Sequence, residues 1–201
     1  MRIISGFAKG LRLYSPHGQT IRPTSDKARE ALFNIIGSHV PDASVLDLFA
    51  GTGAIGLEAF SRGAAHITFV DKSQEALLLI RKNVHLFEKI EKSLQTSDKL
   101  RPVLSSISII KEDLGRRRFS GFLQRSFAKS IFDLIFLDPP YSKGLCLQTL
   151  IALDNSSILT EHGLIIAEEH SGIELPDRFN TLTVEDKRRY GDTGFWFYRM
   201  R

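Results

Sequence analysis

The chain has 201 residues, of which 42% are hydrophobic and 25% charged, and this composition excludes a disordered or collagen-like protein. Its single cysteine, Cys146, excludes an intramolecular disulfide, and its six histidines lack the spacing of metal ligands. No apolar run reaches the roughly 20 residues of a membrane helix, and the first residues lack a secretory signal. We therefore expect a cytoplasmic protein that uses no metal and has no membrane partner.

The formal net charge of +4 lies entirely in the first 40 residues, because the acidic and basic side chains of the remaining chain balance. A basic segment on a neutral body is typical of a surface that binds a polyanion. The alternative, which charge alone does not exclude, is that this segment is an ordinary charged surface in contact with water. The basic residues of the segment are Arg2, Lys9, Arg12, Arg22, Lys27 and Arg29.

These first 40 residues predict a hairpin followed by a helix. Two short extended runs around Gly6 and Gly10 favour a hairpin within residues 1–15. The sequence SDKAREALFNII (25–36) has apolar side chains at helical spacing, and Gly37 would end this helix. We therefore divide the chain into a basic N-terminal extension, residues 1–40, and a main domain, residues 41–201.

In the main domain, short apolar runs alternate with helical stretches. The runs are rich in β-branched and aromatic residues, which suits parallel strands buried on both faces. The alternation predicts a doubly wound α/β fold with a mostly parallel, seven-stranded sheet that ends in an antiparallel pair. The polar segment 93–106 is predicted to be a surface loop. The predicted strands are 45–49, 66–70, 107–110, 132–137, 163–169, 181–185 and 194–199, with helices over about 53–62 and 74–92.

Acidic side chains fall at the ends of the first four predicted strands. Asp47 lies within the first run, Asp71 ends the second, Asp113 follows the third and Asp138 ends the fourth. Open α/β sheets bind ligands at the carboxyl ends of their strands. Four carboxylates along that edge would form a polar groove suited to a ligand that carries a cation and hydroxyl groups.

The segment GTGAIG, residues 51–56, satisfies the glycine pattern of dinucleotide-binding loops, and Asp71 lies 20 residues after Gly51. An acid at that distance can accept hydrogen bonds from ribose hydroxyls. Asp47, which precedes Gly51 by four residues, would repel a pyrophosphate and attract a sulfonium group. The motif therefore favours S-adenosylmethionine. A nicotinamide-dependent oxidoreductase and a purely packing role for the glycines are the alternatives.

A second motif, DPPY, follows the fourth predicted strand as Asp138, Pro139, Pro140 and Tyr141. The two prolines predict a rigid, non-helical loop. In such a loop Asp138 and a backbone carbonyl can accept hydrogen bonds from a planar exocyclic amine, and Tyr141 can stack on the base that carries it. An ordinary Pro-Pro loop is the alternative.

These motifs together resemble a known family. VLDLFAGTGAIGLEAFSRGA (45–64), followed by FVDKS (69–73), resembles the cofactor motif of class I methyltransferases, and FLDPPY (136–141) is similar to that of amino-directed N-methyltransferases. With RPTSDKAREALFN (22–34) and YGDT (190–193), the chain resembles the bacterial 16S rRNA guanine-N2 methyltransferase family, RsmD. The resemblance covers nearly the whole chain and implies the Rossmann-like class I fold.

The resemblance also implies the reaction, which is methyl transfer from S-adenosylmethionine to the 2-amino group of a guanine in 16S rRNA, with S-adenosylhomocysteine as product. The Asp138–Tyr141 loop would hold that amino group, and the six basic residues of the extension would bind rRNA phosphates. We expect a monomer that acts on the small ribosomal subunit or an assembly intermediate. Ser5 departs from the family, where glycine is frequent. The implied cofactor residues are Asp47, Phe49, Gly51 and Gly53 on the methionine side, Asp71 at the ribose and Asp113 at the adenine.

Two other functions share part of this pattern. A DNA adenine-amino methyltransferase would carry the same DPPY loop, but the chain has no recognisable insertion that would read a DNA duplex. An rRNA-binding assembly factor without catalytic activity would keep the basic extension and the fold. Uptake of S-adenosylmethionine would distinguish this second alternative from an enzyme.

Overall fold

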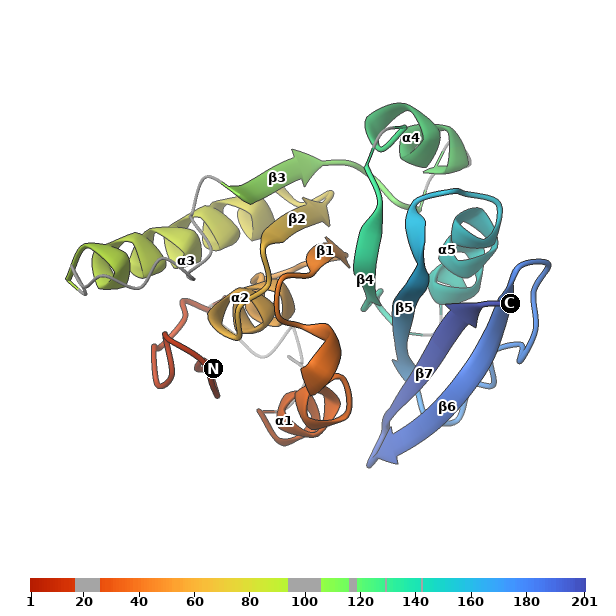
Figure 1. Cartoon of the computed structure of the whole chain (residues 1–201), viewed down its shortest axis with the longest axis horizontal. Helices are drawn as coiled ribbons and strands as arrows, with labels where there is room; N and C mark the ends of the chain where they lie inside the picture. The colour runs from red at the N-terminus through yellow and green to blue at the C-terminus, as the bar shows by residue number, and fades with distance from the viewer. Residues whose placement is uncertain (17–25, 94–105, 116–118, 129, 142) are drawn as a thin grey trace. The chain divides into compact units, whose positions relative to one another are not determined.

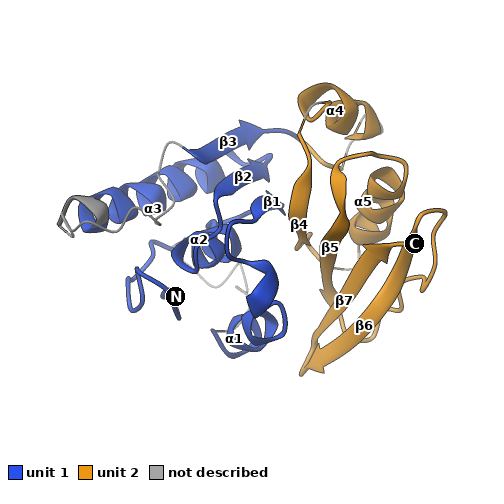
Figure 2. Ribbon diagram, viewed as in Figure 1, with its two compact units in different colours: residues 1–112 blue, residues 113–201 orange. Residues whose placement is uncertain are grey.

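The computed structural model describes residues 1–16, 26–93, 106–115, 119–128, 130–141 and 143–201. The backbone forms two compact units, residues 1–112 and 113–201, which Figure 2 shows in different colours. Arg22, with its predicted role, and residues 94–105 of the predicted loop over 93–106 lie outside the described residues.

Unit 1 is built on three parallel strands in the order β3-β2-β1. Helix α2 packs on β1 and β2, and helix α3 packs on β2 and β3 (Figure 1). Each of these five elements begins and ends within one residue of its predicted range, since buried apolar runs and flanking glycines mark them clearly. Their bounds are Ser44–Leu48 for β1, Ala54–Ser61 for α2, His66–Asp71 for β2, Gln74–Ser93 for α3 and Ile107–Lys111 for β3.

The N-terminal hairpin of unit 1 is confirmed, although its strands are very short. The amide of Ile3 donates to the carbonyl of Leu11 at 2.9 Å, and Arg2 and Arg12 form an isolated antiparallel bridge. Helix α1 (Asp26–Ile35) and a 3-10 turn, η1 (Gly37–His39), lie between the hairpin and β1. The hairpin and α1 therefore belong to unit 1, and a separate functional extension of residues 1–40 stays a prediction.

An aromatic cluster attaches the hairpin to the helices of unit 1. Phe7 of the hairpin lies edge-on to Phe60 of α2 and to Phe87 of α3, with ring centroids 5.7 and 5.8 Å away. Phe60 and Phe87 are themselves 5.9 Å apart in the same arrangement. Edge-to-face pairs add to the free energy gained by burial, so this cluster stabilises the docked hairpin.

Unit 2 has a four-stranded mixed sheet in the order β4-β5-β7-β6, where β4 and β5 are parallel and the other pairs antiparallel. The predicted antiparallel pair at the end of the chain is confirmed, but β5 and β6 are longer than predicted because backbone pairing continues into polar residues. Helices α4 and α5 had no predicted ranges. The bounds are Phe119–Ser126 for α4, Phe132–Leu137 for β4, Leu145–Asp154 for α5, Leu159–His170 for β5, Leu182–Tyr190 for β6 and Thr193–Met200 for β7.

The described residues thus contain the seven predicted strands, of which β1 to β5 alternate with helices and β5 to β7 follow one another directly. Within the same residues, none of the helices combines the length and the apolar composition that crossing a bilayer would require.

Candidate functional site

The glycine loop of unit 1, residues 49–53, follows β1 in left-handed backbone conformations. Phe49, Gly51 and Gly53 have φ values of 61°, 55° and 77°. A left-handed phenylalanine is sterically unfavourable, and such strain is often found where a loop holds a ligand. A Cβ built on Gly51 would find only the Phe49 carbonyl oxygen within 4 Å, at 3.9 Å. The side of Gly51 is therefore open, with room for a bound group.

Gly56, the third glycine of the motif, has a different function. A Cβ at this position would lie 2.4 Å from the ring of Phe69 and 2.9 Å from Ile67, both on β2. Glycine is required here because α2 packs closely against the sheet. The alternative interpretation of the motif, in which its glycines only allow close packing, is therefore correct for Gly56 and not for Gly51.

Asp47 lies on β1 beneath this loop and is 2% exposed. Its Oδ2 accepts a hydrogen bond from the amide of Gly56 at 3.0 Å. Burial raises the pKa of Asp47 to about 7, the Gly56 bond opposes this rise, and the negative charge of Asp71 adds to it. A cation bound at the loop would relieve this unfavourable burial of negative charge.

Asp71, at the end of β2, connects the glycine loop to the start of α3. Its Oδ2 accepts the amide of Gly51 at 2.9 Å, and its Oδ1 accepts the amide of Ser73 at 2.8 Å. The hydroxyl of Ser73 in turn accepts the amide of Ala76, which makes Ser73 the N-terminal cap of α3. The carboxylate of Asp71 therefore holds the loop in its observed shape.

Asn83 of α3 is a site residue that sequence reasoning missed. It is fully buried, its Nδ2 donates to the carbonyl of Thr52 at 2.9 Å, and its Oδ1 accepts the amide of Tyr14 at 2.7 Å. Asn83 thus connects the glycine loop to the N-terminal segment. Its position could have revealed it, since it falls on the apolar stripe of α3 between Ile80 and Phe87, where a polar side chain needs a buried partner.

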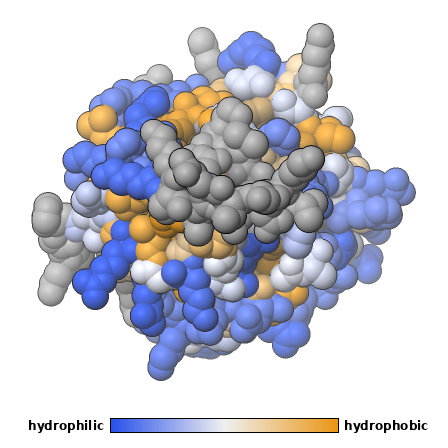
Figure 3. All heavy atoms as spheres, turned by 60° about the vertical axis from the view of Figure 1, so that its left-hand side comes forward, coloured by the Kyte–Doolittle hydropathy of each residue, from blue (hydrophilic) through white to orange (hydrophobic). Residues whose placement is uncertain are grey.

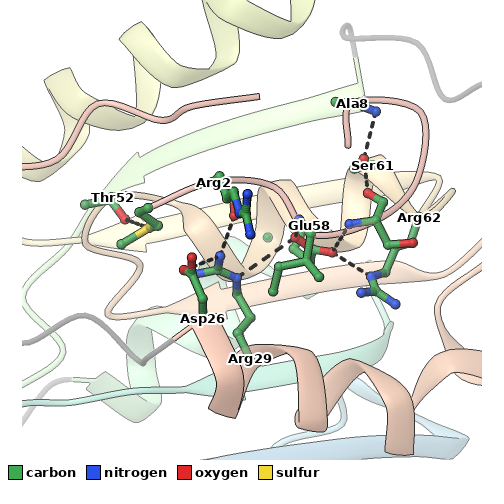
Figure 4. Close-up of polar contacts among 12 residues, drawn as sticks. Arg2, Ala8, Asp26, Arg29, Thr52, Glu58, Ser61 and Arg62 are labelled. Atoms are coloured by element: carbon green, nitrogen blue, oxygen red, sulfur yellow. Dashed lines mark hydrogen bonds and ion pairs between the residues drawn. The ribbon is translucent and has the colours of Figure 1, made fainter. Parts of the chain in front are cut away.

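Glu58 of α2 fastens the hairpin to unit 1 (Figure 4). Its fully buried carboxylate accepts the amides of Ile4 at 2.7 Å and Ser5 at 3.0 Å, and the Nε of Arg62 at 2.7 Å. The hydroxyl of Ser61 accepts the amide of Ala8 at 3.0 Å beside it. Glu58 is a second residue that sequence reasoning missed, although an acid inside an apolar helix is a signal for a buried polar partner.

Four basic residues of the N-terminal segment, Arg2, Lys9, Arg12 and Lys27, are exposed. Hydrophilic residues make up most of the coloured surface on the face that Figure 3 brings forward. Arg29 differs from its expected role, because it is 1% exposed and donates to the carbonyl of Arg2 at 2.5 Å (Figure 4). A buried guanidinium cannot reach an rRNA phosphate, so Arg29 is a structural residue.

In unit 2 the DPPY loop begins directly after β4. Asp138 is half-buried, Pro139 buried and Pro140 exposed. The hydroxyl of Tyr141 donates to Oε1 of Glu168 at 2.6 Å. Burial raises the pKa of Tyr141, and the negative charge of Glu168 raises it further, so the phenol stays protonated.

Asp113 lies two residues after the end of β3 and is half-buried. Its Oδ1 accepts the amide of Gly115 at 3.2 Å, which forms a tight turn at the start of unit 2. The predicted contact of Asp113 with an adenine stays a prediction.

Comparison with known proteins places this chain among methyltransferases. Residues 1–199 match the model of the family described as Conserved hypothetical protein 95. The chain is 34% identical to YlbH of Bacillus subtilis, provisionally named an rRNA methyltransferase, over 100% of both proteins. It is 31% identical to ribosomal RNA small subunit methyltransferase D of Escherichia coli K12, over 99% of this chain and 89% of that protein.

A solved structure supports the same placement. The Escherichia coli protein yhhF, provisionally described as a methyltransferase, is 27% identical and superimposes with a TM-score of 0.79, covering 100% of this chain and 98% of that one. Together with the seven strands described above, this similarity confirms the predicted Rossmann-like α/β fold of class I methyltransferases.

Proposed function

The chain belongs to the family described as Conserved hypothetical protein 95, which includes the small subunit rRNA methyltransferase D proteins, and from this premise we propose its reaction. The protein transfers a methyl group from S-adenosylmethionine to the 2-amino group of a guanine in 16S rRNA. The substrate is the small ribosomal subunit or an assembly intermediate of it.

The residues of unit 1 fit S-adenosylmethionine better than a nicotinamide dinucleotide. Asp47 and Asp71 bring two interacting carboxylates to the glycine loop, and a sulfonium cation would relieve their repulsion where a pyrophosphate would increase it. The side of Gly51 is open, as a bound group requires. We propose that Asp47, Phe49, Gly51 and Gly53 hold the methionine part. Asp71 would accept hydrogen bonds from the ribose and Asp113 would bind the adenine.

This pair of carboxylates at an open glycine loop is the observation that supports the proposal most directly. When bound, S-adenosylmethionine supplies an activated methyl group. The protein needs no nucleophile of its own for such a transfer. Its part is to bind the two substrates, orient the accepting nitrogen and stabilise the charge that develops there.

The DPPY loop of unit 2 supplies the orientation and the stabilisation. Asp138 accepts hydrogen bonds from the guanine amino group, which keeps the nitrogen lone pair out of conjugation with the ring. As the carbon–nitrogen bond forms and the bond from the methyl carbon to sulfur breaks, positive charge develops on that nitrogen, and the carboxylate of Asp138 stabilises it until the nitrogen loses a proton to water. Pro139 and Pro140 restrict the loop, and the ring of Tyr141 stacks on the base.

The exposed basic residues of the N-terminal segment supply affinity for rRNA. Arg2, Lys9, Arg12 and Lys27 bind phosphates, and binding by such contacts weakens as the salt concentration rises. Arg22 is included among these RNA-binding residues on the sequence alone, and Arg29 is excluded because it is buried.

The experiment measures transfer of labelled methyl groups to undermethylated small subunits, naked 16S rRNA and duplex DNA, with products digested to nucleosides. We expect N2-methylguanosine from the RNA substrates only. Labelled N6-methyladenine from DNA would overturn the rRNA assignment. RNA binding without uptake of S-adenosylmethionine would instead indicate a non-catalytic assembly factor.

Asp138→Ala tests the catalytic assignment. We expect this variant to lose methyl transfer while its affinity for S-adenosylmethionine, measured by calorimetry, changes little. The matched control is Asp133→Ala, because Asp133 lies on β4, the strand that Asp138 follows, and accepts the hydroxyl of Thr160 at 3.1 Å. Turnover by Asp138→Ala equal to that of the control would refute the role of Asp138.

A further inference from the structure

We propose that Glu168 of β5 and Thr193 of β7 are positioning residues that hold the Tyr141 ring in the orientation that stacks on the target guanine. This inference rests on the proposed function. It assigns roles to Glu168 and to Thr193, the last residue of the YGDT segment, and both lie within unit 2 with Tyr141.

The Tyr141 hydroxyl has two partners on two different strands. It donates its single proton to Oε1 of Glu168 at 2.6 Å. The hydroxyl of Thr193 lies 3.3 Å away, and because the phenolic proton is already used, Thr193 donates to the phenol oxygen. These two bonds restrict the ring, since turning the first side-chain torsion would move the phenol oxygen away from both partners. Turning the second torsion would rotate the O–H, which prefers the plane of the ring, away from Glu168.

Burial makes the contact with Glu168 a strong one. Glu168 is 4% exposed, and a buried carboxylate is stable only where donors surround it. A hydrogen bond to an ionised acceptor is about twice as strong as one between neutral groups. The raised pKa of Tyr141 keeps the donor proton in place across the neutral range. The edge of the His170 ring, 6.1 Å from that of Tyr141 between centroids, adds a further contact.

The YGDT segment, residues 190–193, gains a physical explanation from this arrangement. Gly191 has a φ of 64° and forms the turn between β6 and β7. The amide of Ser171 donates to the carbonyl of Asp192 at 2.8 Å, which joins the turn to the end of β5. Thr193 is thereby paired with His170 across the β5–β7 ladder, two residues beyond Glu168. The turn therefore places Thr193 beside the same tyrosine that Glu168 binds.

Loop rigidity alone would not orient the ring. Pro139 and Pro140 restrict the backbone of the loop but do not fix the side-chain torsions of Tyr141, which the hydroxyl contacts and the His170 ring restrict. A misplacement of about 1 Å at a reacting group can lower the rate about 100-fold. The chain therefore uses a buried carboxylate on a rigid strand to define where the base lies.

The test combines removal of each partner with a double variant. Tyr141→Phe keeps the ring and loses the hydroxyl, and Glu168→Gln keeps the shape and loses the charge. Each is expected to lower kcat for methyl transfer to the small subunit about 10-fold, which is the effect of losing a hydrogen bond to a charged group. The KM for the subunit and the affinity for S-adenosylmethionine should change less than about twofold, because the ring and the cofactor residues remain. The double variant should also lose about 10-fold instead of about 100-fold, since both changes remove one contact.

Two further variants keep the result unambiguous. Tyr198→Phe is the matched control, because Tyr198 is another buried tyrosine of unit 2 and donates to the carbonyl of Pro176 at 2.9 Å. It should keep the kcat of the wild type. Thr193→Val removes the weaker contact and should lower kcat about threefold. This variant still tests the inference if Glu168→Gln does not fold.

The outcomes separate this inference from the proposed function. Wild-type kcat in Tyr141→Phe, Glu168→Gln and Thr193→Val would overturn the inference, and so would losses that multiply in the double variant. Tyr141→Leu, which lacks the ring, should be nearly inactive. If it is inactive while the other variants are unaffected, the proposed stacking stands and the inference fails. If the wild type itself transfers no methyl group, the proposed function fails.

Discussion

Replacing Glu58 by glutamine should release the N-terminal hairpin from unit 1. The two carboxylate oxygens of Glu58 accept the amides of Ile4 and Ser5 and the Nε of Arg62. A glutamine side chain has only one acceptor oxygen. Its NH2 group would take the place of the other carboxylate oxygen and face an N–H donor, so one or two of these hydrogen bonds would be lost. Arg29, whose Nε lies 4.0 Å from Oε2, would also lose one of its two compensating charges and keep that of Asp26, 3.1 Å from its Nη2.

The size of the effect follows from the burial of both charges, since Glu58 is 0% and Arg29 1% exposed. A hydrogen bond to a charged group contributes about 1.5–3 kcal/mol, and breaking a buried ion pair costs about 3–5 kcal/mol. These contributions overlap because they share one carboxylate, so we expect a loss of about 3 kcal/mol in the free energy of unfolding. For a chain of this length that corresponds to a fall in Tm of about 6–12 °C.

Urea unfolding followed by circular dichroism measures this loss, and limited proteolysis reports whether the hairpin detaches. Glu30→Gln is the matched control, because it makes the same chemical change at an exposed position of α1. A Glu58→Gln variant within about 0.5 kcal/mol of this control would show that Glu58 does not hold the hairpin.

Three other changes test unit 1. Asp47→Asn removes a group whose pKa rises from 3.8 to about 7 on folding, so the wild type loses stability relative to the variant as the pH increases through this range. Thermal unfolding at pH 4 to 8 would contradict this if the difference stayed constant. Gly56→Ala puts a Cβ 2.4 Å from the Phe69 ring and should destabilise by about 1–3 kcal/mol, whereas Gly37→Ala, with nothing within 4 Å, should be neutral. Asn83→Asp places a carboxylate against two carbonyl oxygens and should lower the affinity for S-adenosylmethionine in calorimetry; unchanged affinity would exclude a role in shaping the loop.

Local patterns were sufficient for most of the elements and for the two motifs. The strands and helices of unit 1 lie within one residue of prediction, because apolar periodicity and glycine boundaries depend only on neighbouring residues. The helices α4 and α5 of unit 2 escaped prediction. In α5, LCLQTLIALD is apolar on nearly every side, so it lacks the polar face that marks a surface helix.

What the sequence by itself determined is the chemistry: the family, the glycine loop with Asp47 and Asp71, and the DPPY loop. The tertiary structure decided which polar groups are buried together. In the sequence Arg29 is one more basic residue, and only the structure shows that it is buried. Glu58, Asn83 and Glu168 each bind a partner between 27 and 69 residues away in the chain, which the sequence does not reveal. The physical reason is that a charged or amide side chain looks the same in a sequence whether water or protein satisfies it, and only the folded chain shows which of them does.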